Sequence, residues 1–223
     1  MRTIAANVCG VAEKASSGRI VWADCEMTGL DPDKDALIEV AVIVTDEDLN
    51  VLDGGIDVLI TPPKAALDQM NDFVRDMHTK SGLLEEIKAG GITMEAATKA
   101  IVDYVKAWVP DAGDAPLAGN SIGVDKTFLT KNMPELIDHL HYRIIDVSTL
   151  KELARRWYDR VWQCAPGKAQ GHRALQDITE SINELRYYRA AMLVPTPGPS
   201  SAELKRMAAK VIETSEGGAN ALY

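Results

Sequence analysis

Two carboxylates, Asp24 and Glu26, stand two residues apart at the end of an apolar run that begins at Ile20. Side chains in a strand alternate between its two faces, so both acids should point to the same face. Carboxylates at the end of a buried strand are costly unless they are paired or bind a metal ion. A single Asp-x-Glu pattern is more often a strand end that reaches solvent, so its chemistry depends on what the chain places beside it.

Two further acids stand where additional ligands would be placed. Asp125 follows a short apolar strand and a glycine-containing loop, and Asp177 lies near the start of the last main predicted helix. If the four carboxylates met, each pair about 4 Å apart would repel by roughly 4 kcal/mol at an effective dielectric constant of about 20. Such a site needs hard divalent cations such as Mg²⁺ or Mn²⁺, and two of them about 3.5 to 4 Å apart suit phosphodiester hydrolysis. Taken singly, Asp125 would be a helix-surface acid and Asp177 a first-turn residue favoured by the helix dipole.

His172 is the candidate general base for that reaction. It lies five residues before Asp177, and two positions five apart on an ideal helix point about 140° away from each other. We therefore expect His172 in the loop before the helix, next to Gly171, from which it could accept a proton from the attacking water. An unperturbed imidazole pKa of about 6.5 suits that role near neutral pH. For a histidine considered alone, a solvated loop position is the commoner alternative.

The composition is that of a soluble globular protein: 46% of the 223 residues are hydrophobic, 26% are charged, and no apolar run is long enough to span a membrane. The net charge of −9 argues against a protein that coats long DNA or RNA, because such proteins neutralise many phosphates with Lys and Arg. It does not exclude a very short nucleotide substrate. The three cysteines, Cys9, Cys25 and Cys164, are odd in number and lack metal-type spacing. They favour a cytoplasmic location without disulfides.

The elements that must position Asp24 and Glu26 form a predicted antiparallel meander. The run that starts at Ile20 is followed by a β-branched segment at 36–45 and by a third segment at 51–60. Turn residues separate these segments, so we expect three consecutive strands.

Beyond the meander, predicted strands alternate with predicted helices. A helix is expected at 93–108, capped by Thr93, and strands are expected at 116–120 and 143–147 with a helix at 124–131 between them. Strands joined through helices pair in parallel. The predicted fold class is therefore α/β, with a mixed five-stranded sheet flanked by helices.

The C-terminal third is predicted to be mainly helical. A capping box at 149–152 should begin a helix whose apolar stripe reaches Val161, and the last main helix should run over 174–192. Prolines then break the chain before a short amphipathic helix at 201–213. The expected organisation is an N-terminal extension at 1–18, a catalytic domain at 19–194 and a tail at 195–223 that begins with the prolines.

The order Asp24-x-Glu26, Asp125, His172 and Asp177 resembles that of the DEDDh group of 3′→5′ exonucleases. Within that group the chain is similar to oligoribonuclease over roughly residues 19–193, through separate segments at 22–30, 119–123, 141–143, 146–157 and 171–178. The resemblance implies an RNase H-like fold, a homodimer, two Mg²⁺ or Mn²⁺ ions held by the four acids in each active site, and His172 as the base. It also implies 3′→5′ hydrolysis of diribonucleotides and other very short RNAs to 5′-mononucleotides.

The resemblance further implies contacts with the substrate bases. Leu30 would pack against a base, and His78 would contact the substrate near the aromatic residue at position 73. Many members of the family have tryptophan where this chain has Phe73, so we expect a stacking face of smaller area.

Five residues match the family's pocket for the end of the substrate: Ser121, Tyr142, Arg143, Ser148 and Thr149. The resemblance implies that the second subunit contributes part of this pocket. Arg143 and the hydroxyl groups could hold a terminal 5′-phosphate, so a third nucleotide would collide where a dinucleotide ends. Without the resemblance, Arg143 would be interpreted as a surface ion pair and Ser148 as a helix cap.

Two other functions remain open. A DNA-proofreading or general single-strand exonuclease of the same superfamily would use the same acids but act equally well on long strands. A noncatalytic nucleotide-binding module would keep the metal ligands and bind without hydrolysis. The presence of all five catalytic residues makes the second alternative the weaker one.

Overall fold

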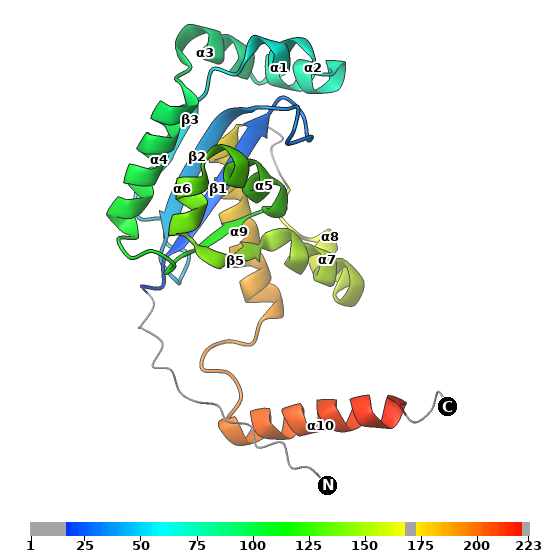
Figure 1. Ribbon diagram of the computed structural model, residues 1–223. Coiled ribbons are helices and arrows are strands. Elements are labelled where there is room, and N and C mark those ends of the chain that lie inside the picture. The colour runs from blue at the N-terminus through cyan, green and yellow to red at the C-terminus, as the bar shows by residue number, and fades with distance from the viewer. Residues whose placement is uncertain (1–16, 168–172, 220–223) are drawn as a thin grey trace.

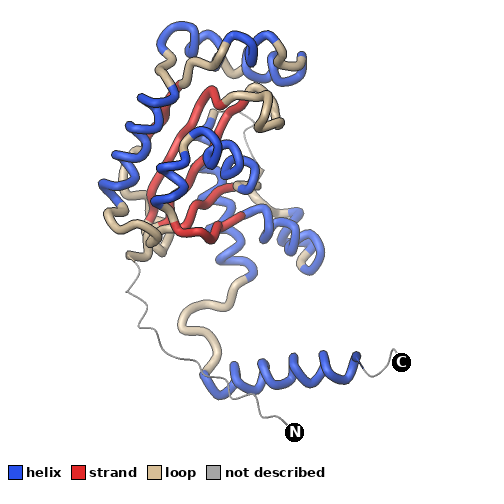
Figure 2. The backbone as a smooth tube through the Cα atoms, in the orientation of Figure 1, coloured by secondary structure: helices blue, strands red, loops and turns tan. Residues whose placement is uncertain are grey.

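A mixed five-stranded sheet lies at the centre of the structure, a computed structural model that describes residues 17–167 and 173–219 (Figure 1). The strands are β1 (Ile20–Met27), β2 (Leu37–Thr45), β3 (Ile56–Leu59), β4 (Pro116–Gly119) and β5 (His141–Asp146). Their order across the sheet is β3-β2-β1-β4-β5. The tube in Figure 2 shows these strands as one layer with helices on both sides. The predicted fold class and mixed sheet are confirmed.

Helices surround this sheet. In the described part of the chain they are α1 (Lys64–Asp68), α2 (Asp72–Lys80), α3 (Leu83–Gly90), α4 (Met94–Trp108), α5 (Gly123–Asn132), α6 (Pro134–His139), α7 (Val147–Trp157), α8 (Asp159–Gln163), α9 (Ala174–Met192) and α10 (Ser201–Ala219). The predicted cap of α4 is confirmed, because the side chain of Thr93 accepts a hydrogen bond from the Ala96 N–H at 3.2 Å. The bounds of α9 also match the prediction. By contrast, α1, α2 and α3 occupy a stretch where the sequence pattern predicts no element.

The sheet combines a meander with parallel additions. β1, β2 and β3 pair in antiparallel fashion, whereas β4 pairs in parallel with both β1 and β5. The third strand is shorter than the predicted 51–60. Its first half is a turn, in which the Asp53 carboxylate accepts a hydrogen bond from the Gly55 N–H at 2.9 Å and Gly55 has a φ of +76°. Val51 makes an isolated bridge with Thr45 instead of joining the strand.

β1 is buried on both faces because helices cover the sheet on each side (Figure 1). Cys25 belongs to the core that α4, α5 and α6 share with the sheet. Trp22 belongs to the opposite core, with α7 and α9, and its indole N–H donates a hydrogen bond to Thr45 at 3.0 Å. Asp24 and Glu26 alternate onto the face of Trp22, so β1 directs both acids toward α9.

Two predictions for the region after β5 are wrong. α7 begins before the predicted capping box, because the Asp146 carboxylate accepts a hydrogen bond from the Ser148 N–H at 2.9 Å and caps the helix. The single helix expected to reach Val161 is divided at Tyr158, whose backbone (φ −140°, ψ 62°) is not helical, into α7 and α8.

The tail carries a longer helix than the predicted 201–213. α10 extends to Ala219 and lies apart from the sheet in Figure 1, with Leu204, Met207 and Val211 exposed. None of the helices in the described ranges combines the length and apolar character needed to cross a membrane.

Candidate active site

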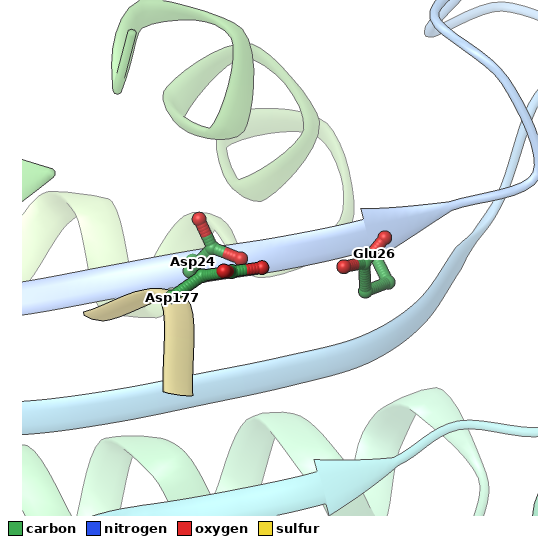
Figure 3. A group of neighbouring side chains, drawn as sticks. All are labelled: Asp24, Glu26 and Asp177. Atoms are coloured by element: carbon green, nitrogen blue, oxygen red, sulfur yellow. The ribbon is translucent and has the colours of Figure 1, made fainter. Parts of the chain in front are cut away.

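Three of the predicted metal ligands converge where α9 crosses β1. Asp24 and Glu26 project from β1, and Asp177 projects from the first turn of α9. One carboxylate oxygen of each lies within 4.8 Å of the others. Figure 3 shows Asp177 reaching toward Asp24, with Glu26 farther along the strand. These three residues are called the carboxylate cluster below.

The fourth predicted ligand, Asp125, lies beside this cluster. It is buried in the first turn of α5, and its carboxylate accepts a hydrogen bond from the Cys25 N–H at 3.0 Å. β4 pairs only with Val21 and Trp22 of β1, so the last residues of β1 have room on that side for α5. Asp125 is therefore tied to the backbone between the two acids of β1.

The electrostatics of the site disfavour four free carboxylates. Burial, together with the charges of Glu39, Asp177 and Asp125, raises the pKa of Glu26 from 4.5 to about 8, although the charge of Arg173 opposes the rise. Burial also raises the pKa of Asp125, to about 6, although hydrogen bonds to its carboxylate oppose the rise. Holding the ionised carboxylates together therefore costs free energy through burial and mutual repulsion, and a bound cation would offset this cost.

The predicted general base lies outside the described residues, and its role stays a prediction. In the sequence, His172 directly precedes Arg173, the N-cap residue of α9.

At the end of β4, two predicted pocket residues meet in a polar network. The Ser121 N–H donates to the Asp146 carboxylate at 2.9 Å and to the Ser148 hydroxyl at 3.0 Å, while the two serine hydroxyl oxygens lie 3.1 Å apart. The Ser148 hydroxyl donates to the side-chain oxygen of Asn120 at 3.1 Å. Ser121 has a φ of +53°, a left-handed conformation that costs energy for a residue other than glycine. These contacts hold the two hydroxyls in a fixed arrangement.

Three members of this network, Asn120, Ser181 and Glu184, were not predicted. The Asn120 amide donates to the Ser181 hydroxyl at 2.8 Å and to the buried Glu184 carboxylate at 3.0 Å. Asp177, Ser181 and Glu184 occupy positions i, i+4 and i+7 of α9, which share one helix face. This polar stripe on an otherwise core-facing helix is the sequence signal that could have revealed Ser181 and Glu184. Asn120, Ser121, Ser148, Ser181 and Glu184 are called the Asn120 network below.

The other predicted pocket residues lie on the edge strand β5 and in the first turn of α7. Tyr142 on β5 stacks against His141, with ring centroids 4.5 Å apart. The Arg143 guanidinium carbon lies 5.4 Å from the centroid of the Tyr142 ring. Thr149, in the first turn of α7, is exposed. Tyr142 and Arg143 thus offer an aromatic ring and a positive charge to solvent, five or six residues before Ser148 in the sequence.

The residues predicted to contact bases differ in accessibility. Leu30 and Phe73 are 75% and 78% exposed, so both apolar side chains face solvent. His78 is fully buried: its Nε2 lies 2.8 Å from the Met27 carbonyl oxygen and its Nδ1 lies 3.8 Å from a Glu26 oxygen. The His78 ring is thus turned toward the end of β1, and its contact with substrate stays a prediction.

Known proteins resemble this chain over most of its length. A family model described as an exonuclease matches residues 21–185. An oligoribonuclease from Leifsonia xyli subsp. xyli is 56% identical over 198 residues, which are 89% of this chain and 95% of that protein. This chain belongs to the oligoribonuclease family. Another member of the family, from Streptomyces griseus, is 56% identical over 193 residues, or 86% of this chain and 96% of that protein.

Solved structures place this oligoribonuclease-family chain in the RNase H-like exonuclease fold. Exonuclease I of E. coli, in a complex with single-stranded DNA, aligns with a TM-score of 0.59 at 13% identity over 79% of this chain and 41% of its own. Exonuclease I from Methylocaldum szegediense aligns with a TM-score of 0.55 at 17% identity over 78% and 41%. This chain spans about two-fifths of the length of those proteins, and the likeness concerns the fold. The family makes the chain an exonuclease, a hydrolase of phosphodiester bonds.

Proposed function

We propose that this exonuclease degrades very short RNAs, above all diribonucleotides, from the 3′ end to 5′-mononucleotides in the cytoplasm. The observation that carries the proposal is the carboxylate cluster, with its three oxygens within 4.8 Å of one another. The relatives' name, oligoribonuclease, supports short RNA as the substrate class.

The residues of the cluster fit divalent cations. Their ligand atoms are all carboxylate oxygens, which suit hard divalent cations. Burial raises the pKa of Glu26 to about 8, so a nearby cation would favour its ionised form. Asp24, Glu26, Asp125 and Asp177 would hold two Mg²⁺ or Mn²⁺ ions. When bound, such ions lower the pKa of an attacking water and offset the charge on the leaving oxygen.

His172 would take the proton from the attacking water. It stands in the sequence directly before Arg173, the N-cap residue of α9, and five residues before Asp177, which supports a role at the cluster. A neutral imidazole within hydrogen-bond reach of the water suits this step near neutral pH.

The Asn120 network would bind the other end of the substrate. Ser121 and Ser148 offer hydroxyls held 3.1 Å apart, and hydroxyl groups together with a guanidinium are suitable partners for a terminal 5′-phosphate. Tyr142, Arg143 and Thr149 would complete this pocket, with part of it supplied by the second subunit of a homodimer. Leu30 and Phe73 would cover the bases.

A length series tests the proposal. Purified protein is incubated with Mg²⁺ or Mn²⁺ and 5′-phosphorylated RNAs from two nucleotides upward, and turnover and products are followed by chromatography. A steep fall in kcat/KM beyond two nucleotides, with 5′-mononucleotides as products, is expected. Equal rates on long single strands would favour a general single-strand exonuclease, and metal-dependent binding without products would favour a noncatalytic module.

A further inference from the structure

Arg173 connects three elements at the entrance to α9. Its two terminal nitrogens donate hydrogen bonds to the two carboxylate oxygens of Glu86 on α3, both at 2.9 Å. Its Nε donates to one carboxylate oxygen of Glu39 on β2 at 3.2 Å. The other oxygen of Glu39 accepts a hydrogen bond from the Ala174 N–H at 3.4 Å. Arg173, Glu39 and Glu86 are called the Arg173 latch below.

The latch differs from an ordinary surface ion pair because one of its acids is in the core. Glu39 is fully buried and lies directly across the strands from Glu26. Burial raises the pKa of Glu39 and of its neighbour Asp57, and the Arg173 guanidinium opposes both rises. A buried carboxylate that loses its cation is left with uncompensated charge, so breaking the pair of Glu39 and Arg173 would be costly in free energy. The bidentate geometry with Glu86 fixes the guanidinium further.

The latch also fixes the first turn of α9. Arg173 is the N-cap residue, yet its side chain does not cap the helix, and the buried Glu39 accepts the Ala174 N–H instead. The Asp177 N–H donates to the Arg173 carbonyl oxygen at 3.0 Å, so Arg173 is the base of the turn that carries Asp177. Moving Arg173 would therefore move Asp177 relative to the two acids of β1.

We propose that Arg173 is a positioning residue that, through Glu39 and Glu86, holds the first turn of α9 so that the Asp177 carboxylate meets Asp24 and Glu26. This role rests on the proposed function, in which Asp177 holds a divalent ion. In this role Arg173 would touch neither substrate nor reacting atoms. It acts through the placement of Asp177.

The test compares Mn²⁺ binding in matched variants. Arg173→Gln breaks the latch, Arg173→Lys keeps the charge without the bidentate geometry, and Arg189→Gln breaks the 2.9 Å ion pair with Asp48 near the other end of the same helix. Mn²⁺ affinity is measured by calorimetry, dinucleotide turnover is measured across Mn²⁺ concentrations, and the unfolding temperature is measured in EDTA. We expect Arg173→Gln to weaken Mn²⁺ binding about 10- to 100-fold, as is typical for residues that support metal ligands. Arg173→Lys should recover part of this loss, and Arg189→Gln should bind Mn²⁺ like the wild type.

Several outcomes would overturn the positioning role. One is a folded Arg173→Gln variant with wild-type Mn²⁺ affinity, even if its unfolding temperature is lower. Another is an equal loss of affinity in Arg189→Gln, which would indicate general weakening of α9. If Arg173→Gln does not fold, Glu86→Gln takes its place, because it leaves the buried pair of Arg173 and Glu39 intact; unchanged affinity there would overturn the role. A wild-type protein that binds no Mn²⁺ would overturn the proposed function and this role together, whereas the preceding outcomes leave the proposed function standing.

Discussion

Glu26 and Glu184 are both buried glutamates near the two ends of the proposed site, but their surroundings differ. Glu26 faces other acids, and burial raises its pKa to about 8. Glu184 faces donors: the Asn120 amide at 3.0 Å, the Tyr188 hydroxyl at 3.3 Å and the Lys151 ammonium at 3.5 Å. The carboxylate cluster therefore favours a cation, whereas Glu184 lies among hydrogen-bond donors of the protein itself.

This difference in surroundings predicts a structural role for Glu184 and a metal-binding role for Glu26. A buried carboxylate among donors stabilises the fold, and removing its oxygens would leave those donors without an acceptor. A buried carboxylate among other carboxylates weakens the metal-free fold and contributes to function when a cation arrives. Variants at the two ends should accordingly fail in different assays.

The largest effect is expected from Glu26→Gln. Turnover of a dinucleotide should fall about 10³-fold or more, because a catalytic metal ion supplies several kcal/mol of transition-state stabilisation. Steady-state kinetics in Mn²⁺ measure the loss. Glu184→Gln is the matched control, since it makes the same chemical change at a buried glutamate outside the cluster, and it should keep Mn²⁺ binding. Equal loss of Mn²⁺ binding in both variants would remove the distinction between the two ends.

His172→Ala separates binding from proton transfer. Turnover should fall about 10²- to 10⁴-fold, as for the loss of a general base, while Mn²⁺-dependent binding of the dinucleotide remains. Single-turnover kinetics and equilibrium binding to a labelled dinucleotide measure the two properties. Near-normal turnover in the variant would exclude His172 as the base.

Asn120→Ala tests the Asn120 network. It removes the partner of Ser148 and one donor to Glu184, so the free energy of unfolding should fall by about 1 to 3 kcal/mol. We also expect kcat/KM for the dinucleotide to fall about tenfold, since the hydroxyls lose their fixed arrangement. Mn²⁺ affinity, measured by calorimetry, should stay at the wild-type value. Weakened Mn²⁺ binding in this variant would mean that the two ends are not separable.

The smallest effect is the pH dependence of metal-free stability. The pKa of Glu26 is raised from 4.5 to about 8 in the folded protein, so the folded state holds a proton that the unfolded state releases. The stability contributed by that proton is fully present below about pH 4.5 and is lost as the pH rises through about 8. In EDTA the unfolding temperature should therefore fall by several degrees between pH 5 and pH 8, since about 1 kcal/mol corresponds to about 2 to 4 °C in a chain of this size.

Two comparisons check that assignment. In Glu26→Gln the position carries no titratable group, so the fall in unfolding temperature should be smaller. With saturating Mn²⁺, which binds the deprotonated carboxylates, the fall should be offset in the wild type. An identical fall in wild type and Glu26→Gln, measured by calorimetry, would assign the pH dependence to other groups.

Local patterns were enough to predict the frame of the site. β1 could be predicted because its acids follow an apolar run at the period of a strand. α4 could be predicted because Thr93 stands just before an apolar stripe. These signals are short in range and regular in period. They also predicted that Asp177 would begin a helix, which brings it to the carboxylate cluster.

The contacts that support the site could not be predicted in this way. Arg173 and Glu39 are 134 residues apart, and Asn120 and Glu184 are 64 residues apart, so no local period relates them. The burial of His78 depends on how α2 packs against the end of β1. The true start of α7 depends on a choice between two good capping residues, Asp146 and Thr149, three positions apart, and tertiary contacts decide between them.

One helix carries residues of both ends of the site. Asp177 and Glu184 are seven residues apart on α9, which corresponds to about 10 Å along its axis. In the proposed site, the spacing along α9 between Asp177 of the carboxylate cluster and Glu184 of the Asn120 network is therefore set by the rise of a helix. Inserting one residue between them would rotate Glu184 by about 100° and lengthen this spacing by about 1.5 Å. Substrate length would then be a property of helical geometry, open to change in steps of a single residue.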